Sequence, residues 1–109
     1  MFLIDGYNLL HALSPGRATP EARAQLVHRI EAHCRAGGYR ARVVFDATGA
    51  MKRRETRGPV ELRSVAQGRT ADEEILDSLT RTADRTKYTV VSDDGAIVKE
   101  ARKRGFEVL

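Results

Sequence analysis

Several residue types are scarce in this sequence, and each shortage excludes a class of protein. Cys34 is the only cysteine, so the chain can form no internal disulfide and no zinc site built from thiolates. Tryptophan is absent and aromatic residues make up 6%, which leaves no evident platform of rings for stacking bases. Three prolines and no low-complexity tract, with 41% apolar residues, are typical of a globular chain. At 109 residues, we expect one domain spanning residues 1–109.

Long hydrophobic segments are missing as well. No apolar run approaches the ~20 residues that cross a bilayer. The N-terminus lacks the basic region, apolar stretch and cleavage site of a signal peptide. We therefore expect a cytoplasmic protein with no membrane partner.

The charge balance is basic. Lysine and arginine number 19 against 15 acidic residues, a net charge of +4, and 15 of the 19 are arginine. Arginine binds phosphate through a rigid fork, which suits polyanionic partners, but arginine-rich chains also arise from base composition or thermal adaptation. The bias alone therefore decides little.

Hydrophobic patterning predicts strands that alternate with helices. Strands are expected at residues 1–4, 42–45, 60–65, 88–91 and 106–109. Helices are expected from Thr19-Pro20 to Gly37-Gly38, and over residues 71–84 and 96–104. Residues 5–8 and 92–95 are expected to be turns and residues 49–58 a polar, basic loop. Because the apolar parts of these strand runs suggest burial on both faces, we expect a mainly parallel sheet with helices on each side.

Carboxylates follow three of these expected strands. The carboxyl ends of parallel strands share one edge of the sheet, where open α/β folds bind ligands. An acid in the first turn of the helix at 71–84 is expected near the same edge, favoured there by the helix dipole. Oxygen ligands gathered in this way suit Mg²⁺ or Mn²⁺. The acids are Asp5, Asp46, Asp72, Asp93 and Asp94.

A structural role is open for most of these acids taken one at a time, because acids at strand ends and helix starts often act as caps and turn formers. Thr70 and Glu73 match a capping box, in which each side chain bonds the other's backbone N–H. Glu74 is expected on the solvent-facing side of that helix. Asp5 is harder to explain as a cap, since it directly follows a strand. The five acids together, and not any one of them alone, indicate a metal site.

Four short motifs together resemble a known family: LIDGYNLL at residues 3–10, VVFD at 43–46, TADE at 70–73 and VVSD at 90–93. They are similar, in the same order, to the NYN domain of the PIN-like nuclease superfamily, in its YacP-like branch. The resemblance implies a PIN-like three-layer α/β/α sandwich with a mainly parallel central sheet. It also implies a divalent-metal site that cleaves RNA, with RNA, including ribosome-associated mRNA, as the partner.

The resemblance also assigns positions. Asp5, Asp72 and Asp93 fall on acidic site positions, Asn8 on the polar position beside the first Asp, and Asp46 on the acid after the second strand. Family members often carry a further helix and a basic stretch beyond the last strand. The sequence ends at Leu109, so we expect part of the usual substrate surface to be missing or rebuilt.

These residues suit an endoribonuclease mechanism in which metal-activated water attacks the phosphodiester. Asp5, Asp72 and Asp93 would hold one or two ions of Mg²⁺ or Mn²⁺, which lower the pKa of water and neutralise charge on the scissile phosphate. Asp46 and Asp94 are further candidate ligands. Asn8 is expected to orient the water or to hold Asp5 through a hydrogen bond.

Basic residues near the acidic edge are the candidate RNA contacts. A flexible cationic loop beside an acidic site is suited to clamping an RNA backbone. A merely solvated loop is the alternative, and the basic residues of the last helix are expected to face solvent. The candidate contacts are Lys52, Arg53, Arg54, Arg57 and Arg69.

Three other kinds of protein also carry acids at the edge of a parallel sheet, and the sequence can be compared with each. A haloacid-dehalogenase-like phosphatase needs a second Asp two residues after the first, where Tyr7 stands. A receiver domain needs paired acids after the first strand and a lysine after the fifth, which are not found. A non-catalytic RNA- or ribosome-binding module that keeps the acidic pocket is the stronger alternative. The presence of all three aspartates, Asp5, Asp72 and Asp93, favours the nuclease over it.

Overall fold

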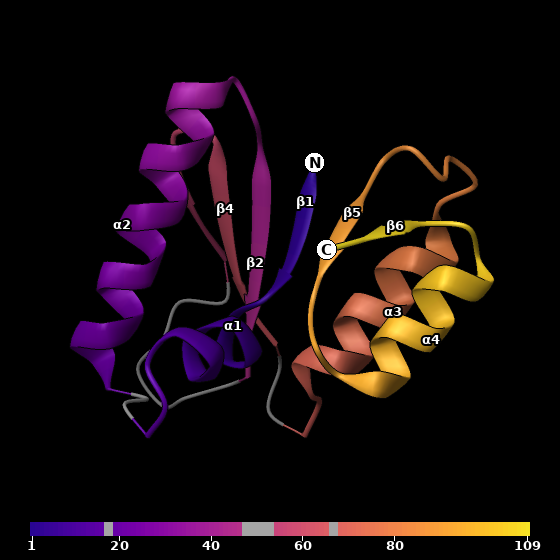
Figure 1. The fold of residues 1–109 in the computed structure, drawn as a ribbon, viewed down its shortest axis with the longest axis horizontal. Coiled ribbons are helices and arrows are strands. Elements are labelled where there is room, and N and C mark those ends of the chain that lie inside the picture. The colour runs from indigo at the N-terminus through magenta and orange to yellow at the C-terminus, as the bar shows by residue number, and fades with distance from the viewer. Residues whose placement is uncertain (17–18, 47–53, 66–67) are drawn as a thin grey trace.

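A computed structural model describes residues 1–16, 19–46, 54–65 and 68–109, and it has six strands and four helices in those ranges (Figure 1). In chain order they are β1 (Phe2–Asp5), α1 (Gly6–Leu13), α2 (Pro20–Gly37), β2 (Ala41–Phe45), β3 (Arg54–Arg57), β4 (Val60–Ser64), α3 (Ala71–Arg81), β5 (Thr89–Val91), α4 (Gly95–Lys103) and β6 (Glu107–Val108). No helix in this part of the chain is long and apolar enough to cross a bilayer.

All strands join one sheet in the order β3-β4-β2-β1-β5-β6. Every neighbouring pair is parallel except β3 with β4, which is antiparallel. The central strand β1 pairs with β2 on one side and with β5 on the other. Their carboxyl ends therefore lie along one edge, and the sequence continues from β1 directly into α1 and from β5, within three residues, into α4.

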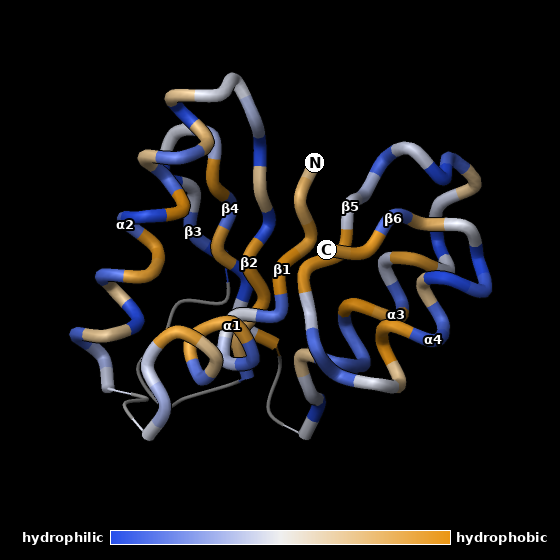
Figure 2. The backbone as a smooth tube through the Cα atoms, viewed as in Figure 1, coloured by the Kyte–Doolittle hydropathy of each residue, from blue (hydrophilic) through white to orange (hydrophobic). Residues whose placement is uncertain are grey.

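Helices cover both faces of the sheet, as expected for an α/β/α sandwich. Neighbouring strand residues point to opposite faces, so Leu3 packs in the core beneath α3 and α4, and Ile4 packs in the core beneath α1 and α2. In β2, Val44 belongs to the first core and Val43 and Phe45 to the second. Figure 2 shows the hydrophobic residues concentrated on the central strands and on the helix sides that face them.

Three expectations about the elements need correction. Residues 5–8 were expected as a turn, but Asp5 ends β1 and α1 begins at Gly6. A Cβ on Gly6 would lie 2.4 Å from a ring carbon of Phe45, so a residue without a side chain lets the helix start against β2. The expected loop at 49–58 contains the edge strand β3, whose residues pair with β4. Helix α3 ends at Arg81 and not at residue 84.

Candidate active site

Asp5 is the most buried acid of the described residues, with 6% of its surface exposed. It is the last residue of β1, and its side chain accepts a hydrogen bond from Ser92 Oγ at 3.4 Å, just beyond β5. The pKa of Asp5 is raised from its ordinary 3.8 to about 6, mainly by burial and also by the charges of Asp72 and Asp46. The carboxylate therefore sits where a negative charge is costly.

Asp72 faces this position from the first turn of α3. Its pKa is raised by burial, by the charge of Asp94 and a hydrogen bond with it, and by the charge of Asp46. Asp72 contributes in turn to the raised pKa of Asp5. The structure thus brings four acids together at the carboxyl edge of the sheet: Asp5 at the end of β1, Asp46 just after β2, Asp72 in α3 and Asp94 just before α4.

Asp46 and Asp94 also have structural roles in this edge. Asp46 Oδ1 accepts the backbone N–H of Ala71 at 2.7 Å, which ties the end of β2 to the start of α3. Asp94 is the N-cap of α4, because its Oδ1 accepts the N–H groups of Ala96 at 3.0 Å and Ile97 at 3.1 Å. The capping interpretation and the site interpretation are therefore compatible for these two acids.

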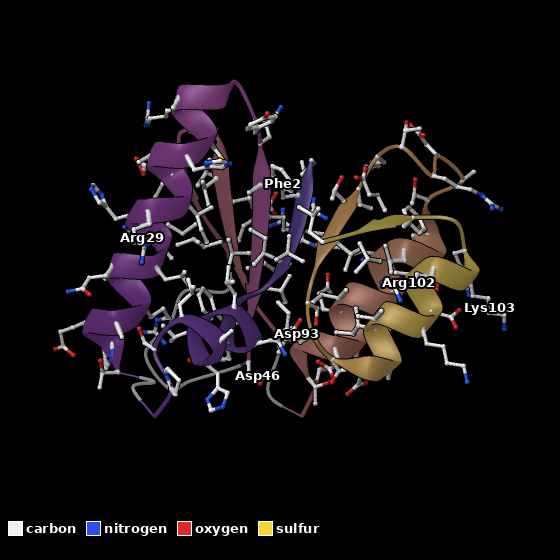
Figure 3. All side chains as sticks on the ribbon, in the orientation of Figure 1. Phe2, Arg29, Asp46, Asp93, Arg102 and Lys103 are labelled. Carbon is white, nitrogen blue, oxygen red and sulfur yellow. The ribbon has the colours of Figure 1, made fainter. Side chains whose placement is uncertain are left out.

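Asp93 takes part in a different way. Figure 3 places Asp93 and Asp46 at the same end of the sheet, but the Asp93 side chain is exposed. Its backbone N–H donates to Asn8 Oδ1 at 2.8 Å. The carboxylates that raise the pKa values of Asp5 and Asp72 are those of Asp46, Asp72 and Asp94, and Asp94 shares a side-chain hydrogen bond with Asp72. Asn8 positions the turn after β5 in this structure.

The donor set of this cluster fits a hard divalent cation better than any neutral ligand. A cation would relieve the repulsion that raises the pKa values of Asp5 and Asp72, and carboxylate oxygens are its preferred ligands. In the described part of the chain, however, no group of three or more His, Cys, Asp or Glu side chains is already arranged around a common point. Holding a metal through three carboxylates would require the side chains to turn toward one another.

The candidate RNA contacts that the structure describes do not form one surface. Lys52 and Arg53 lie outside the described residues. Arg54 pairs in register with Arg63 and so faces the α3 side of the sheet, while Arg57 pairs with Val60 and faces the α2 side. Arg69, just before α3, contacts Asp77, and its Nη1 lies 4.0 Å from Glu74 Oε2. Arg54 and Arg69 therefore share a face from which Arg57 is separated.

Glu74 was expected to face solvent, but its side chain is only 13% exposed. Its carboxylate lies 2.9 Å from the guanidinium of Arg63, in β4, and 3.4 Å from that of Arg81, at the end of α3. The sequence contains one sign of this role, because Glu74 and Arg81 are seven residues apart and share a side of the helix. The approach of Arg63 from β4 has no local signal in the sequence. By contrast, Thr70 and Glu73 form the predicted capping box.

Comparison with known proteins adds to this geometry. The family model of the YacP-like NYN domain matches residues 2–109. The chain belongs to this family. Two solved structures are similar to this YacP-like NYN domain: Rae1 (YacP) from Bacillus subtilis, at 26% identity and a TM-score of 0.79 over 100% of this chain and 67% of that chain, and a point mutant of the same protein, at 27% identity and a TM-score of 0.77 over 98% and 67%. Comparison with curated protein sequences gives no significant match.

The family match and the fold confirm the resemblance noted from the four sequence motifs. They also confirm the expected α/β fold with a mostly parallel six-stranded sheet. Membership of this YacP-like NYN family points to an RNase-type function.

Proposed function

We propose that this protein is an endoribonuclease that cleaves RNA phosphodiester bonds at the acidic edge, with Mg²⁺ or Mn²⁺ as cofactor. The observation that supports it most is the buried Asp5 facing Asp72, with Asp46 and Asp94 beside them. Burying and crowding carboxylates is unfavourable, and sites where it persists are commonly functional. Family membership supports the same reaction class.

Each residue has a distinct part in this proposal. Asp5 and Asp72 would hold the cation, with Asp93 as the third ligand that the family pattern implies. Asp94, which shares a hydrogen bond with Asp72, is a further candidate ligand. The bound cation supplies charge neutralisation at the scissile phosphate and activation of water. Asn8 keeps the turn that carries Asp93 and Asp94 in place through its bond to the Asp93 N–H. Ser92 holds the Asp5 carboxylate in a fixed orientation.

Substitution of single carboxylates tests the proposal. Asp5→Asn and Asp72→Asn keep the side-chain size but remove a charge from the site, so cleavage of RNA should be lost while the fold remains. The matched control is Asp84→Asn, an exposed Asp in the turn between α3 and β5. The assay measures cleavage of a structured and an unstructured RNA with and without chelator, with a thermal melt of every variant. Cleavage that persists in Asp5→Asn, or that ignores the chelator, contradicts the metal mechanism.

A second function has an observation of its own. The acids of the described residues form no ready metal cage, and Asp46 and Asp94 already bond backbone N–H groups. This favours an RNA- or ribosome-binding module in which the acidic edge is structural. In that case RNA binds with similar affinity to wild type and Asp5→Asn, and neither cleaves it under any divalent cation.

A further inference from the structure

A cavity of about 550 Å³ lies on the α3 side of the sheet, apart from the acidic cluster. It lies between α3 and the outer strands β3 and β4. Its walls carry four arginines and one glutamate, and its remaining lining comes from the end of β4. The lining residues are Arg54, Arg63, Ser64, Val65, Arg69, Glu74 and Arg81.

Two carboxylates hold the arginines of this cavity in place. Glu61 binds Arg63 at 2.8 Å and Arg54 at 3.8 Å, and Glu74 binds the other guanidinium edge of Arg63 at 2.9 Å. Arg63 is 18% exposed, so the pair of glutamates fixes a half-buried guanidinium at the base of the cavity. Its Nε is buried without a hydrogen-bond partner among the described residues. Such a fixed guanidinium loses little freedom when it binds an anion.

The acids do not cancel the positive charge of this group. Three acids contact the arginines, whereas five arginines take part when the one that pairs with Glu61 from β2 is included, so an excess of two positive charges remains. The acids are Glu61, Glu74 and Asp77, and the arginines are Arg42, Arg54, Arg63, Arg69 and Arg81. Arg54 and Arg81 are 69% and 63% exposed, and their contacts with Glu61 and Glu74 are long, at 3.8 Å and 3.4 Å, so an anionic ligand can compete for both guanidinium groups.

The cavity and the acidic cluster lie on opposite sides of the first turn of α3. Asp72 faces Asp94 and Asp5, whereas Glu74, two residues later, faces Arg63. Residues two apart on a helix point to nearly opposite sides. One strand that reaches both places would therefore cross the start of α3, a helix about 10–12 Å wide with its side chains.

We propose that this arginine cavity binds a phosphate group of the RNA strand whose scissile bond lies at the acidic edge. The choice of RNA rests on the proposed function, whereas the binding of phosphate to the cavity does not require cleavage. Arginine forks match phosphate oxygens bidentately, and Ser64 adds a hydroxyl at the wall. Glu74 contacts Arg63, Arg69 and Arg81 in the free protein. The phosphate would replace Glu74 as their partner, while Glu61 continues to hold Arg63.

The test measures RNA binding in chelator, so that cleavage does not interfere. Arg54→Gln/Arg81→Gln removes two exposed charges from the cavity and should weaken binding about tenfold. The slope of log affinity against log salt concentration should also become shallower, by about 0.7 for each single-strand phosphate that the variant no longer neutralises. The control, Arg102→Gln/Lys103→Gln, removes two charges from the exposed end of α4 (Figure 3) and should leave both quantities close to wild type. Thermal melts verify that each variant is folded.

A third variant changes binding in the opposite direction. Glu74→Gln removes the carboxylate that competes with phosphate, so it should tighten RNA binding several-fold if it remains folded. Two oligonucleotides of one sequence, with a 5′-phosphate or a 5′-hydroxyl, identify the source of the phosphate. If Arg54→Gln/Arg81→Gln loses more affinity for the 5′-phosphorylated strand than for the other, the cavity binds a terminal phosphate. If it loses the same affinity for both strands, the cavity binds an internal phosphodiester.

The outcomes separate the two proposals. Equal weakening by the cavity and control variants would reflect general charge and overturns the phosphate site, as does wild-type binding in Arg54→Gln/Arg81→Gln. Cavity-dependent binding with no cleavage under any cation overturns the nuclease function but leaves the phosphate site standing.

Discussion

Asn8 Oδ1 accepts the backbone N–H of Asp93 at 2.8 Å, although the two residues are 85 positions apart in the sequence. The bond joins α1, which follows β1, to the turn that follows β5. The same turn carries Ser92, which donates to Asp5, and Asp94, which caps α4. The Asn8 side chain therefore connects the segments that follow the neighbouring strands β1 and β5 at the candidate site.

Asn8→Ala removes this connection, and we expect a loss of about 0.5–1.5 kcal/mol in unfolding free energy. Cleavage should fall by more than this stability loss explains, because the turn that holds Asp94 is released. Hydrogen exchange of the Asp93 amide, followed by NMR, should become faster in Asn8→Ala. Asn8→Asp keeps an acceptor and should retain the protection. Equal protection of that amide in Asn8→Ala and wild type would contradict the role of the bond.

Because of Asp5, the metal-free protein should be more stable in mild acid than at neutral pH. Because the pKa of Asp5 is about 6 in the folded state and 3.8 ordinarily, folding favours the protonated form. This contribution is complete below pH 3.8 and is lost as the pH rises through 6. Asp5→Asn should therefore raise the unfolding free energy at pH 7 by about 1–3 kcal/mol, and by much less near pH 4. Urea unfolding of both proteins in chelator at the two pH values measures the difference.

Gly6→Ala should destabilise the protein by about 1–3 kcal/mol, because its Cβ would lie 2.4 Å from the Phe45 ring. Gly95→Ala, at the first position of α4, is the matched control, since a Cβ there meets nothing within 4 Å. We expect that control to be neutral or slightly stabilising. Phe45→Leu should partly rescue Gly6→Ala in the double variant. Additive losses in the double variant would show that the contact is not the cause.

A divalent cation should stabilise the wild type if the acidic edge holds it. At a cation concentration of 100 times the dissociation constant, the gain is about 2.7 kcal/mol. Thermal melts with Mg²⁺ or Mn²⁺ should show this gain in wild type and in Asp84→Asn, but not in Asp72→Asn. A cation response that is the same in Asp72→Asn and wild type would place the ion elsewhere.

The sequence predicts those parts of the fold that depend on local patterns. Apolar runs predict β1, β2, β4 and β5, and helical spacing with the Thr70 and Glu73 capping box predicts the start of α3. The end of α3 is different, because Asp84 and Thr86 form a turn of their own: Asp84 Oδ1 accepts the Thr86 N–H at 2.9 Å. Such side-chain bonds compete with helical ones, and the apolar spacing does not reveal them.

Helix α1 and strand β3 depend on contacts between distant residues. Gly6 and Asn8 disfavour a helix locally, but the packing of Gly6 on Phe45 and the burial of Leu10 stabilise α1. Strand β3 exists through its register with β4, which no local composition indicates.

In the candidate site, too, some features are predictable from the sequence and others depend on contacts between distant residues. The sheet topology accounts for acids gathering at one edge, and the roles assigned to Asp5, Asp72 and Asp93 stay predictions. Which acids face each other is set by side-chain directions, and these bring Asp94 into a hydrogen bond with Asp72. The partners of Glu74 come from β4 and from the far end of α3, so local sequence patterns do not predict its burial.

No residue separates β1 from α1, since Asp5 is both the last residue of the strand and the N-cap of the helix. Its Cα is therefore fixed by sheet pairing on one side and by helical bonding on the other. Any adjustment to an ion or to a differently shaped RNA must come from the opposing acids, Asp72 and Asp94, through movement of α3 or α4. In the evolution of new specificities, we expect the starts of those two helices to vary in length and sequence while the junction at Asp5 keeps its geometry.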